Sequence, residues 1–232
     1  PKARVLRMDA DTTRNKGDYE AILSAFARHE ADILIGTQMI VKGHDFPNVT
    51  LVGIIAADLS LYTGDFRASE RTFQLLCQAA GRAGRDALPG EVVIQTYHPE
   101  HYSIVAAACG DYEAFYEQEL LYRRLMKYPP ASHILLMLLT SAGEEQAVKA
   151  VSLLGEALKH YMQEQKIDAD IIGPAPAGLS KLNDIYRQLI YIKHDDYRVL
   201  VELKNFLEGY FIYSQQFSVC NLSFDFDLMG SY

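Results

Sequence analysis

The chain has 232 residues, of which 49% are hydrophobic, so it is long enough for one or two domains with real cores. Its formal net charge of −8 argues against a surface that is basic throughout. Residues 67–85 nevertheless carry four arginines against one acid, so any polyanion site is expected to be local and to lie there. The longest apolar run, Ile134–Leu139, is too short to span a bilayer, and no signal peptide is predicted. Widely spaced Cys77, Cys109 and Cys220 argue against a zinc site or disulfide framework here and favour a reduced, cytosolic protein.

The first part of the chain is predicted to alternate strands and helices. Helices are predicted over Gly17–His29 and Arg67–Ala80, where apolar residues recur at helical spacing. The predicted strands are Ala3–Met8, Asp32–Thr37, Thr50–Ala57 and Glu91–Tyr97. The second and third are near-continuous apolar runs, as expected for strands buried on both faces of a parallel sheet. The order β-α-β-β-α-β predicts an α/β lobe over residues 1–108 whose mostly parallel sheet is small for this class.

A charged, tyrosine-rich helix over Asp111–Lys127 is predicted to stop at Tyr128–Pro130, because a residue before proline disfavours helix. It makes residues 109–130 a linker. A second domain follows over residues 131–232, and its order βαββαβ predicts an α+β, ferredoxin-like fold. Its predicted elements are His133–Ser141, Glu144–Gln163, Asp170–Gly173, Tyr186–Lys193, Asp196–Tyr210 and Val219–Leu228.

The strongest chemical signal is the segment Gln78–Arg85, which has the pattern Q-x-x-G-R-x-G-R. An arginine that reaches a transferring phosphoryl group stabilises the charge that spreads over its oxygens. Guanidinium suits this role because it is always charged and donates in a planar fork. Gly81 and Gly84 let the backbone approach and turn, so that Arg82 and Arg85 can point at one phosphate tail. The alternative is a glycine-rich helix end with solvated arginines.

A second signal lies about 40 residues upstream, in Ile35–Val49. Thr37 follows a predicted buried strand, at the end where open α/β sheets usually contact ligands. A G-x-D-hydrophobic-P string follows, although Asp45 taken alone would equally suit a turn or a helix N-cap. The two signals resemble motifs V and VI of superfamily-2 helicases. Their order and spacing favour this functional interpretation over either structural one.

The resemblance implies a truncated RecA-like lobe of the P-loop NTPase type, with site residues in three groups. The expected catalytic residues, two arginine fingers and a glutamine that orients them or a water, are Arg82, Arg85 and Gln78. The expected nucleotide-binding residues are Gly43, Asp45, Gly81 and Gly84. The expected DNA-binding residues are Thr37, Gln38, Lys42 and Arg67.

Strings outside these motifs resemble the PriA family of replication-restart helicases, also called primosomal protein N′. These strings are Arg7–Thr13, Ala57–Tyr62, Asp65–Leu76, Tyr128–Pro130, Gly173–Ala177, Tyr186–Arg187 and Phe224–Asp227. Leu228 departs from the family, where a proline is usual. The resemblance implies an ATP-dependent 3′-to-5′ DNA helicase that recognises stalled or abandoned replication forks and initiates primosome assembly for replication restart. The implied location is the cytoplasm, at the nucleoid, with no membrane.

No G-x-x-x-x-G-K-[ST] or D-E-x-H string occurs in the sequence. We therefore expect ATP and Mg²⁺ to be bound mainly by a lobe outside this chain, and the chain alone to be inactive. His29–Asp32 reads H-E-A-D, but it lies before a strand and is interpreted as a solvated connection. In the family, a cysteine-rich insertion binds Zn²⁺, which is expected in the whole protein but not here. The implied partners are forked and single-stranded DNA, single-strand DNA-binding protein, and primosome and helicase-loading proteins.

Three weaker signals stay open. His98 and His101 suggest a metal pair, but no third ligand is visible, so a loop is favoured. The linker helix carries cations that contact a DNA backbone or form a solvated face; these are Arg123, Arg124 and Lys127. By resemblance, Lys181 and Arg187 contact branched DNA or single-strand DNA-binding protein. From residue 101 onward, eleven basic and seventeen acidic residues weaken a role in DNA binding alone.

Two other functions are kept as alternatives. A RecG-like fork translocase shares motifs V and VI but lacks the D-F-R-A-S-E-R and Y-P-P strings. A non-catalytic DNA- or protein-binding adaptor would keep the lobe for binding only. Whether a P-loop lies upstream in the parent reading frame discriminates the adaptor from the helicase.

Overall fold

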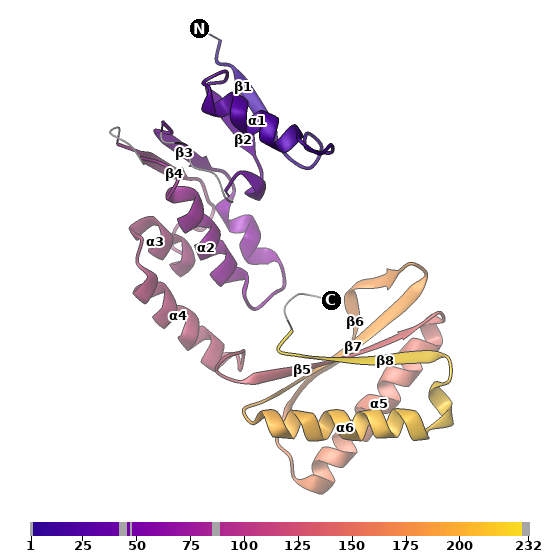
Figure 1. Cartoon of the computed structure of the whole chain (residues 1–232). Coiled ribbons are helices and arrows are strands. Elements are labelled where there is room, and N and C mark those ends of the chain that lie inside the picture. Colours follow the sequence, from indigo (N-terminus) through magenta and orange to yellow (C-terminus); the bar gives the residue numbers. More distant parts are fainter. Residues whose placement is uncertain (1, 42–45, 47, 85–88, 229–232) are drawn as a thin grey trace. The chain divides into compact units, whose positions relative to one another are not determined.

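The computed structural model describes residues 2–41, 46, 48–84 and 89–228. The chain divides into two compact units (Figure 1). The first unit consists of Pro1–Thr63 and Arg67–Tyr116, and the second of Gly64–Phe66 and Glu117–Tyr232. Each unit is described by itself. The second unit therefore includes three residues from the middle of the first part of the chain.

The first unit contains two parallel pairs of strands, each pair joined through a helix. The first pair and its helix are β1 (Val5–Met8), α1 (Asp18–Ala27) and β2 (Ile33–Gly36). The second pair and its helix are β3 (Leu51–Ile54), α2 (Ala68–Ala80) and β4 (Glu91–Ile94). Two short 3₁₀ helices follow strands: η1 (Gln38–Val41) lies after β2, and η2 (Ala57–Tyr62) lies after β3. The α-helix α3 (Tyr102–Cys109) follows β4. The predicted α/β class and the parallel strand direction are confirmed, but among the described residues the strands form two separate sheets.

The prediction that β2 and β3 are buried on both faces is wrong. Ile35 in β2 is 55% exposed, and Leu51 in β3 is 59% exposed. In the described part of the chain β2 and β3 are not hydrogen-bonded to each other, and the two sheets to which they belong have only two strands each. The apolar side chains that a wider, doubly covered sheet would enclose therefore remain in contact with water.

The core of the first unit lies around the second strand pair. α2 packs on α3 and η2, with Phe73 and Leu76 almost fully buried. Phe73 stacks on Phe115 with ring centroids 4.2 Å apart. Phe115 belongs to α4 (Tyr112–Leu125), whose residues up to Tyr116 lie in the first unit. The predicted helix of the linker is thus present, and the boundary between the two units falls within it.

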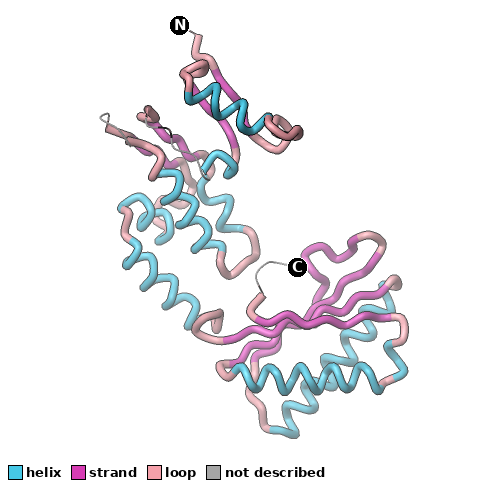
Figure 2. The backbone as a smooth tube through the Cα atoms, in the orientation of Figure 1, coloured by secondary structure: helices cyan, strands magenta, loops and turns pink. Residues whose placement is uncertain are grey.

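The second unit is a four-stranded antiparallel sheet with two helices on one face (Figure 2). Its elements are β5 (His133–Ser141), α5 (Glu144–Gln165), β6 (Asp170–Leu182), β7 (Ile185–His194), α6 (Tyr197–Tyr213), η3 (Gln215–Phe217) and β8 (Cys220–Phe226). The strand order is β6-β7-β5-β8, with every neighbouring pair antiparallel. This order places one strand between β5 and β6 and confirms the predicted ferredoxin-like arrangement.

Alternation along the central strand β5 gives the second unit two buried faces. Leu135, Met137 and Leu139 point into the core beneath α5 and α6 and are fully buried. Ile134 and Leu136 point to the opposite face, where they meet a smaller cluster. Phe66 and Tyr128 contribute side chains to that cluster, and neither belongs to a strand. The sheet is therefore packed on both sides.

Candidate nucleotide and DNA site

The first part of the candidate site is the turn that follows β2. Gly36 ends the strand so close to β1 that a Cβ atom there would collide with the carbonyl oxygen of Met8. Only glycine fits without backbone movement. Thr37 and Gln38 follow directly, and both side chains are exposed. They therefore lie at the carboxyl end of β2, as predicted, and are accessible to a ligand.

Beyond Val41, the structure describes motif V only at Phe46, Asn48 and Val49. Lys42, Gly43 and Asp45, predicted to contact DNA and nucleotide, lie outside the described residues. Phe46 packs edge-on against Phe26 of α1, with ring centroids 5.1 Å apart. This contact ties the segment after the predicted aspartate to α1.

Motif VI begins on the last turn of α2. Gln78 is exposed on that turn, and the helix ends with Gly81 at the C-cap, whose N–H donates to Cys77. Arg82 follows and is half-buried, its N–H donating to Ala79 at 3.0 Å. The negative end of the helix dipole lies here, so it favours cations beyond the helix.

Near the end of motif VI, Gly84 packs closely against Gly90. Gly84 has φ +69°, a left-handed conformation that favours glycine, and a Cβ there would lie 2.6 Å from the nitrogen of Gly90. The Gly84 N–H donates to the carbonyl oxygen of Val49 at 3.0 Å. This hydrogen bond joins the end of motif V to motif VI. Arg85, the second predicted arginine finger, lies outside the described residues.

The predicted DNA-binding residue Arg67 lies at the other end of α2. It is the N-cap residue, and its carbonyl accepts from the N–H of Arg71 at 2.9 Å. Gln78 lies eleven positions further along the chain, which corresponds to about 16 Å along a helix axis. The structure thus groups Gln78, Gly81, Arg82 and Gly84 at one end of α2 but does not bring Arg67 to them.

A buried carboxylate was missed by the sequence analysis. Asp58, in η2, is only 4% exposed, and its Oδ1 accepts from the N–H of Tyr97 at 3.2 Å. Burial raises the pKa of Asp58, but hydrogen bonds from backbone N–H groups and Thr96 outweigh it, so the pKa is lowered. The charged form holds η2 to the segment after β4. The family-like string Ala57–Tyr62 therefore has a structural role here. A single acid among apolar residues was the signal in the sequence that could have revealed it.

The linker cations fall into two groups. Arg123 is 8% exposed, and its Nε donates to Glu119 Oε1 at 2.7 Å. Both predicted roles for Arg123, DNA contact and solvated face, are therefore wrong, because it is enclosed in a buried ion pair. Arg124 is exposed, and Lys127 forms an ion pair with Asp170 at 2.8 Å. Arg124 and Lys127 remain at the surface, as the prediction requires.

The hairpin of β6 and β7 carries the two cations predicted in the second domain. Lys181 pairs with Asp184 at 2.9 Å in the turn, and its Nζ lies 5.1 Å from the ring centroid of Tyr186. Arg187 donates to the carbonyl oxygen of Leu179 at 3.4 Å. The two residues thus lie on one hairpin, beside the register shift that follows Pro176.

His101 has a structural role as well. Its Nδ1 accepts from the N–H of Ser103 at the N-terminus of α3, and its ring stacks on Tyr102. His98 lies beside Glu100. Within the ranges that the structure describes, no group of three or more His, Cys, Asp or Glu side chains could hold a metal ion. In the H-E-A-D string, His29, Glu30 and Asp32 are exposed, as predicted for a solvated connection, whereas Ala31 is buried; Asp32 pairs with Arg4 at 2.7 Å.

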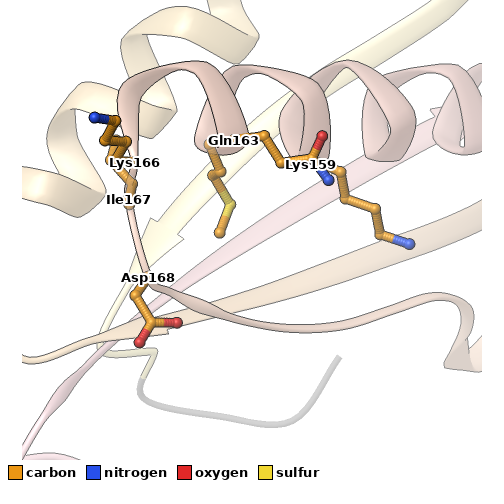
Figure 3. A pocket seen from close by; sticks show the side chains of 6 residues that line it. Lys159, Gln163, Lys166, Ile167 and Asp168 are labelled. Atoms are coloured by element: carbon orange, nitrogen blue, oxygen red, sulfur yellow. The ribbon is translucent and has the colours of Figure 1, made fainter.

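A shallow depression lies at the C-terminal end of α5, in the second unit (Figure 3). Its volume is about 390 Å³, and it opens widely to solvent. Figure 3 shows Lys166, Ile167 and Asp168 where the chain leaves the helix, with Lys159 and Gln163 on the preceding turns. None of the residues that the motifs single out lines it. No helix in the described part of the chain is long and apolar enough to cross a membrane.

Comparisons with known proteins match both units. Residues 2–87 match the family described as the helicase conserved C-terminal domain, and residues 124–227 match the primosomal protein N C-terminal domain. Together they define the class: a helicase lobe followed by a primosomal domain. The relatives are named replication restart protein PriA. The chain is 48% identical over 212 residues to the PriA protein of Bacillus subtilis. It is 39% identical over 205 residues to the PriA protein of Synechocystis and 37% identical over 211 residues to the PriA protein of Treponema pallidum.

The chain belongs to the PriA family, as its motifs predict. The three alignments cover 88–90% of this chain. They cover 26%, 24% and 32% of the Bacillus, Synechocystis and Treponema proteins. The chain thus spans about a quarter to a third of the length of these relatives.

Proposed function

We propose that this chain supplies the second motor lobe and the C-terminal domain of an ATP-dependent 3′-to-5′ DNA helicase that restarts replication at stalled or abandoned forks. The observation that carries the proposal is the Gly84 N–H···O=C Val49 hydrogen bond, because it holds the end of motif V beside motif VI. The sequence identity to proteins named for replication restart supports the same role.

The proposed chemistry belongs to the end of α2. The nucleotide would supply a phosphoryl group whose transfer spreads negative charge over its oxygens. Arg82, directly beyond the helix, and Arg85 after it would stabilise that charge, and the exposed Gln78 would orient them or a water. The helix dipole favours cations here but offers no N–H groups to an anion, so the arginines must provide the attraction.

ATP and Mg²⁺ would be held mainly by a lobe outside this chain. The residues present suit part of that site, since exposed glycines and a half-buried arginine at a helix end can approach phosphates from one side. A loop of the P-loop pattern, which would cradle the phosphates, does not occur in the sequence. Gly43 and Asp45 would respond to the state of the nucleotide, and Zn²⁺ would belong to another part of the protein.

DNA is the proposed partner of the first unit. Thr37 and Gln38, exposed after β2, would grip the backbone of the tracking strand, with Lys42 and Arg67 adding charge. Branched DNA or single-strand DNA-binding protein would contact Lys181 and Arg187 in the second unit. Helicase-loading proteins of the primosome would complete the assembly in the cytoplasm.

The test is a comparison of DNA-stimulated ATPase activity between the full-length protein and this 232-residue chain. We expect hydrolysis that rises with single-stranded or forked DNA for the full-length protein and background hydrolysis for the chain alone. Full-length protein that binds forked DNA but never hydrolyses ATP would favour the adaptor. Hydrolysis by the chain alone would overturn the proposal that another lobe binds ATP.

A further inference from the structure

The segment Gly64–Phe66 belongs to the second unit, although the residues on both sides of it belong to the first. The ring of Phe66 stacks on that of Tyr128, with centroids 5.3 Å apart and planes 19° from parallel. Both rings pack against the smaller core of the second unit, beside Ile134 and Leu136. Phe66 is therefore part of the hydrophobic packing of the second unit.

Two cations fix this aromatic pair. The guanidinium carbon of Arg123 lies 5.4 Å from the ring centroid of Phe66, and the ammonium of Lys193 lies 3.9 Å from that of Tyr128. Such cation–π contacts stabilise most where the groups are shielded from water. Arg123 and Lys193 are 8% and 7% exposed. The aromatic pair thus sits among charges that hardly contact solvent.

Both cations have further partners that hold them in place. Arg123 Nε donates to Glu119 at 2.7 Å, and its Nη1 donates to the carbonyl oxygen of Pro129 at 3.0 Å. Lys193 Nζ donates to the carbonyl oxygen of Met126 at 2.9 Å. A buried charge that lacks hydrogen-bond partners is costly, so these bonds hold both cations in place. Phe66 is therefore held in a defined place within the second unit.

Phe66 also lies two residues before the first residue of α2. α2 is a continuous helix over Ala68–Ala80 and carries Gln78 on its last turn, followed by Arg82. A helix of 13 residues is a rod about 20 Å long that moves as a body. The chain therefore connects an anchored aromatic ring to motif VI through one rigid element.

We infer that Phe66 is a positioning residue that couples motif VI to the second unit: it anchors the start of α2, so that nucleotide-driven movement at Arg82 reaches the C-terminal domain. The inference rests on the proposed function, because it assigns that helicase a coupling element. Hydrolysis itself needs no contact from Phe66, whereas unwinding needs movement to be transmitted. Loss of the anchor should therefore separate the two activities.

The experiment measures DNA-stimulated ATPase and forked-duplex unwinding in parallel on the full-length protein, comparing wild type with Phe66→Ala. We expect the ATPase rate to change little, and unwinding per ATP hydrolysed to fall about 5- to 150-fold, the range of coupling between two sites. Phe66→Tyr, which keeps the ring, should restore unwinding. An unchanged ratio of unwinding to hydrolysis in Phe66→Ala would overturn the inference.

Two further variants separate coupling from loss of stability. Leu189→Ala removes a side chain, 6% exposed, from the same core cluster, but Leu189 lies on β7 and not beside α2. We expect it to lower the stability of the second unit without uncoupling hydrolysis from unwinding. Two glycines inserted between Phe66 and Arg67 should keep the packing of Phe66 and still uncouple ATP hydrolysis from unwinding. Uncoupling by Leu189→Ala at comparable thermal stability, or full coupling in the insertion variant, would contradict the anchor.

The same measurements distinguish this inference from the proposed function. If wild-type full-length protein neither hydrolyses ATP nor unwinds DNA, the proposed function fails and no coupling exists to test. If wild type does both and Phe66→Ala retains its normal ratio of unwinding to hydrolysis, the proposed function stands and the anchor fails.

Discussion

The two units differ in how completely they bury their apolar residues. In the second unit both faces of the central strand β5 are covered, and Leu135, Leu136 and Met137 have no exposed surface. In the first unit the strands form two pairs, and apolar side chains such as Ile35 and Leu51 are more than half exposed. The residues predicted to carry the chemistry therefore lie in the less completely packed unit.

This difference indicates where stability and function lie in the chain. Burial of apolar surface is the main favourable contribution to folding, so we expect the second unit to be the stable part. The exposed strand faces and motif ends of the first unit suit a lobe that works against another lobe, as the proposed function requires. Exposed apolar patches of this kind commonly mark interaction surfaces.

The largest expected effect compares one leucine from each unit. Leu154, in α5, is fully buried in the main core, and Leu154→Ala should lower the free energy of unfolding of the second unit by ~2–5 kcal/mol. Leu51→Ala, at a position 59% exposed, should change stability by less than ~0.5 kcal/mol. Urea denaturation of the chain, followed by circular dichroism, measures both. Similar losses from the two substitutions would show that β3 is covered in solution.

A smaller effect on stability is expected from replacing Gly84 or Gly110 by alanine. The two glycines have the same backbone conformation but different surroundings. Gly84 and Gly110 have φ +69° and +67°, so alanine at either position costs ~1–2 kcal/mol of left-handed strain. A Cβ at Gly110 meets no atom within 4 Å, whereas one at Gly84 would collide with Gly90. Gly84→Ala should therefore also lower DNA-stimulated ATPase in the full-length protein, and Gly110→Ala should not. Equal ATPase rates for the two variants would mean that this close approach does not shape motif VI.

The smallest expected effect is a pH dependence in the second unit. Asp196 caps the N-terminus of α6, and its hydrogen bonds from the Arg198 side chain and N–H lower its pKa to about 2. The unfolded chain keeps a value near 3.8, so the stabilisation is complete above about pH 4 and is lost as the pH falls towards 2. We expect the Tm to fall by a few degrees over this range because of Asp196.

Asp196→Asn provides the matched control, because asparagine keeps the cap without the titrating charge. Its Tm should show a weaker dependence on pH between 4 and 2 than that of the wild type. High salt should reduce the difference, since the side chain of Arg198 is 89% exposed and that of Asp196 is 40% exposed. An identical pH dependence in both proteins would mean that the charge of Asp196 does not contribute to stability.

The order of elements in the second unit was predictable because hydrophobic alternation and helical spacing are local signals. The main miss was the length of β6, which was predicted to end at Gly173 but continues to Leu182. Pro174 and Pro176 predicted a break. β6 is an edge strand with register shifts at this region, and edge strands tolerate prolines because one side needs no ladder hydrogen bonds.

In the rest of the chain, the wrong predictions concern features that depend on contacts between residues far apart in the sequence. Apolar composition predicted burial of β2 and β3, but burial depends on which strands are neighbours, which periodicity does not specify. Arg123 is a surface residue by type and is buried because Glu119 and Pro129 provide partners. The inclusion of Phe66 in the second unit depends on contacts more than 50 residues along the chain. Gln78, Gly81 and Arg82 lie together because they are near neighbours in the sequence, at the end of one helix.

The most direct test of the central claim is DNA-stimulated ATPase of the full-length protein with arginines replaced one at a time. Arg82→Ala and Arg85→Ala should each lower the rate by about three to five decades while nucleotide binding is retained. Arg71→Ala, an exposed arginine on the same helix but outside motif VI, should remain close to wild type. Unchanged rates in both motif variants would show that motif VI is structural and would contradict the proposed catalytic role of the end of α2.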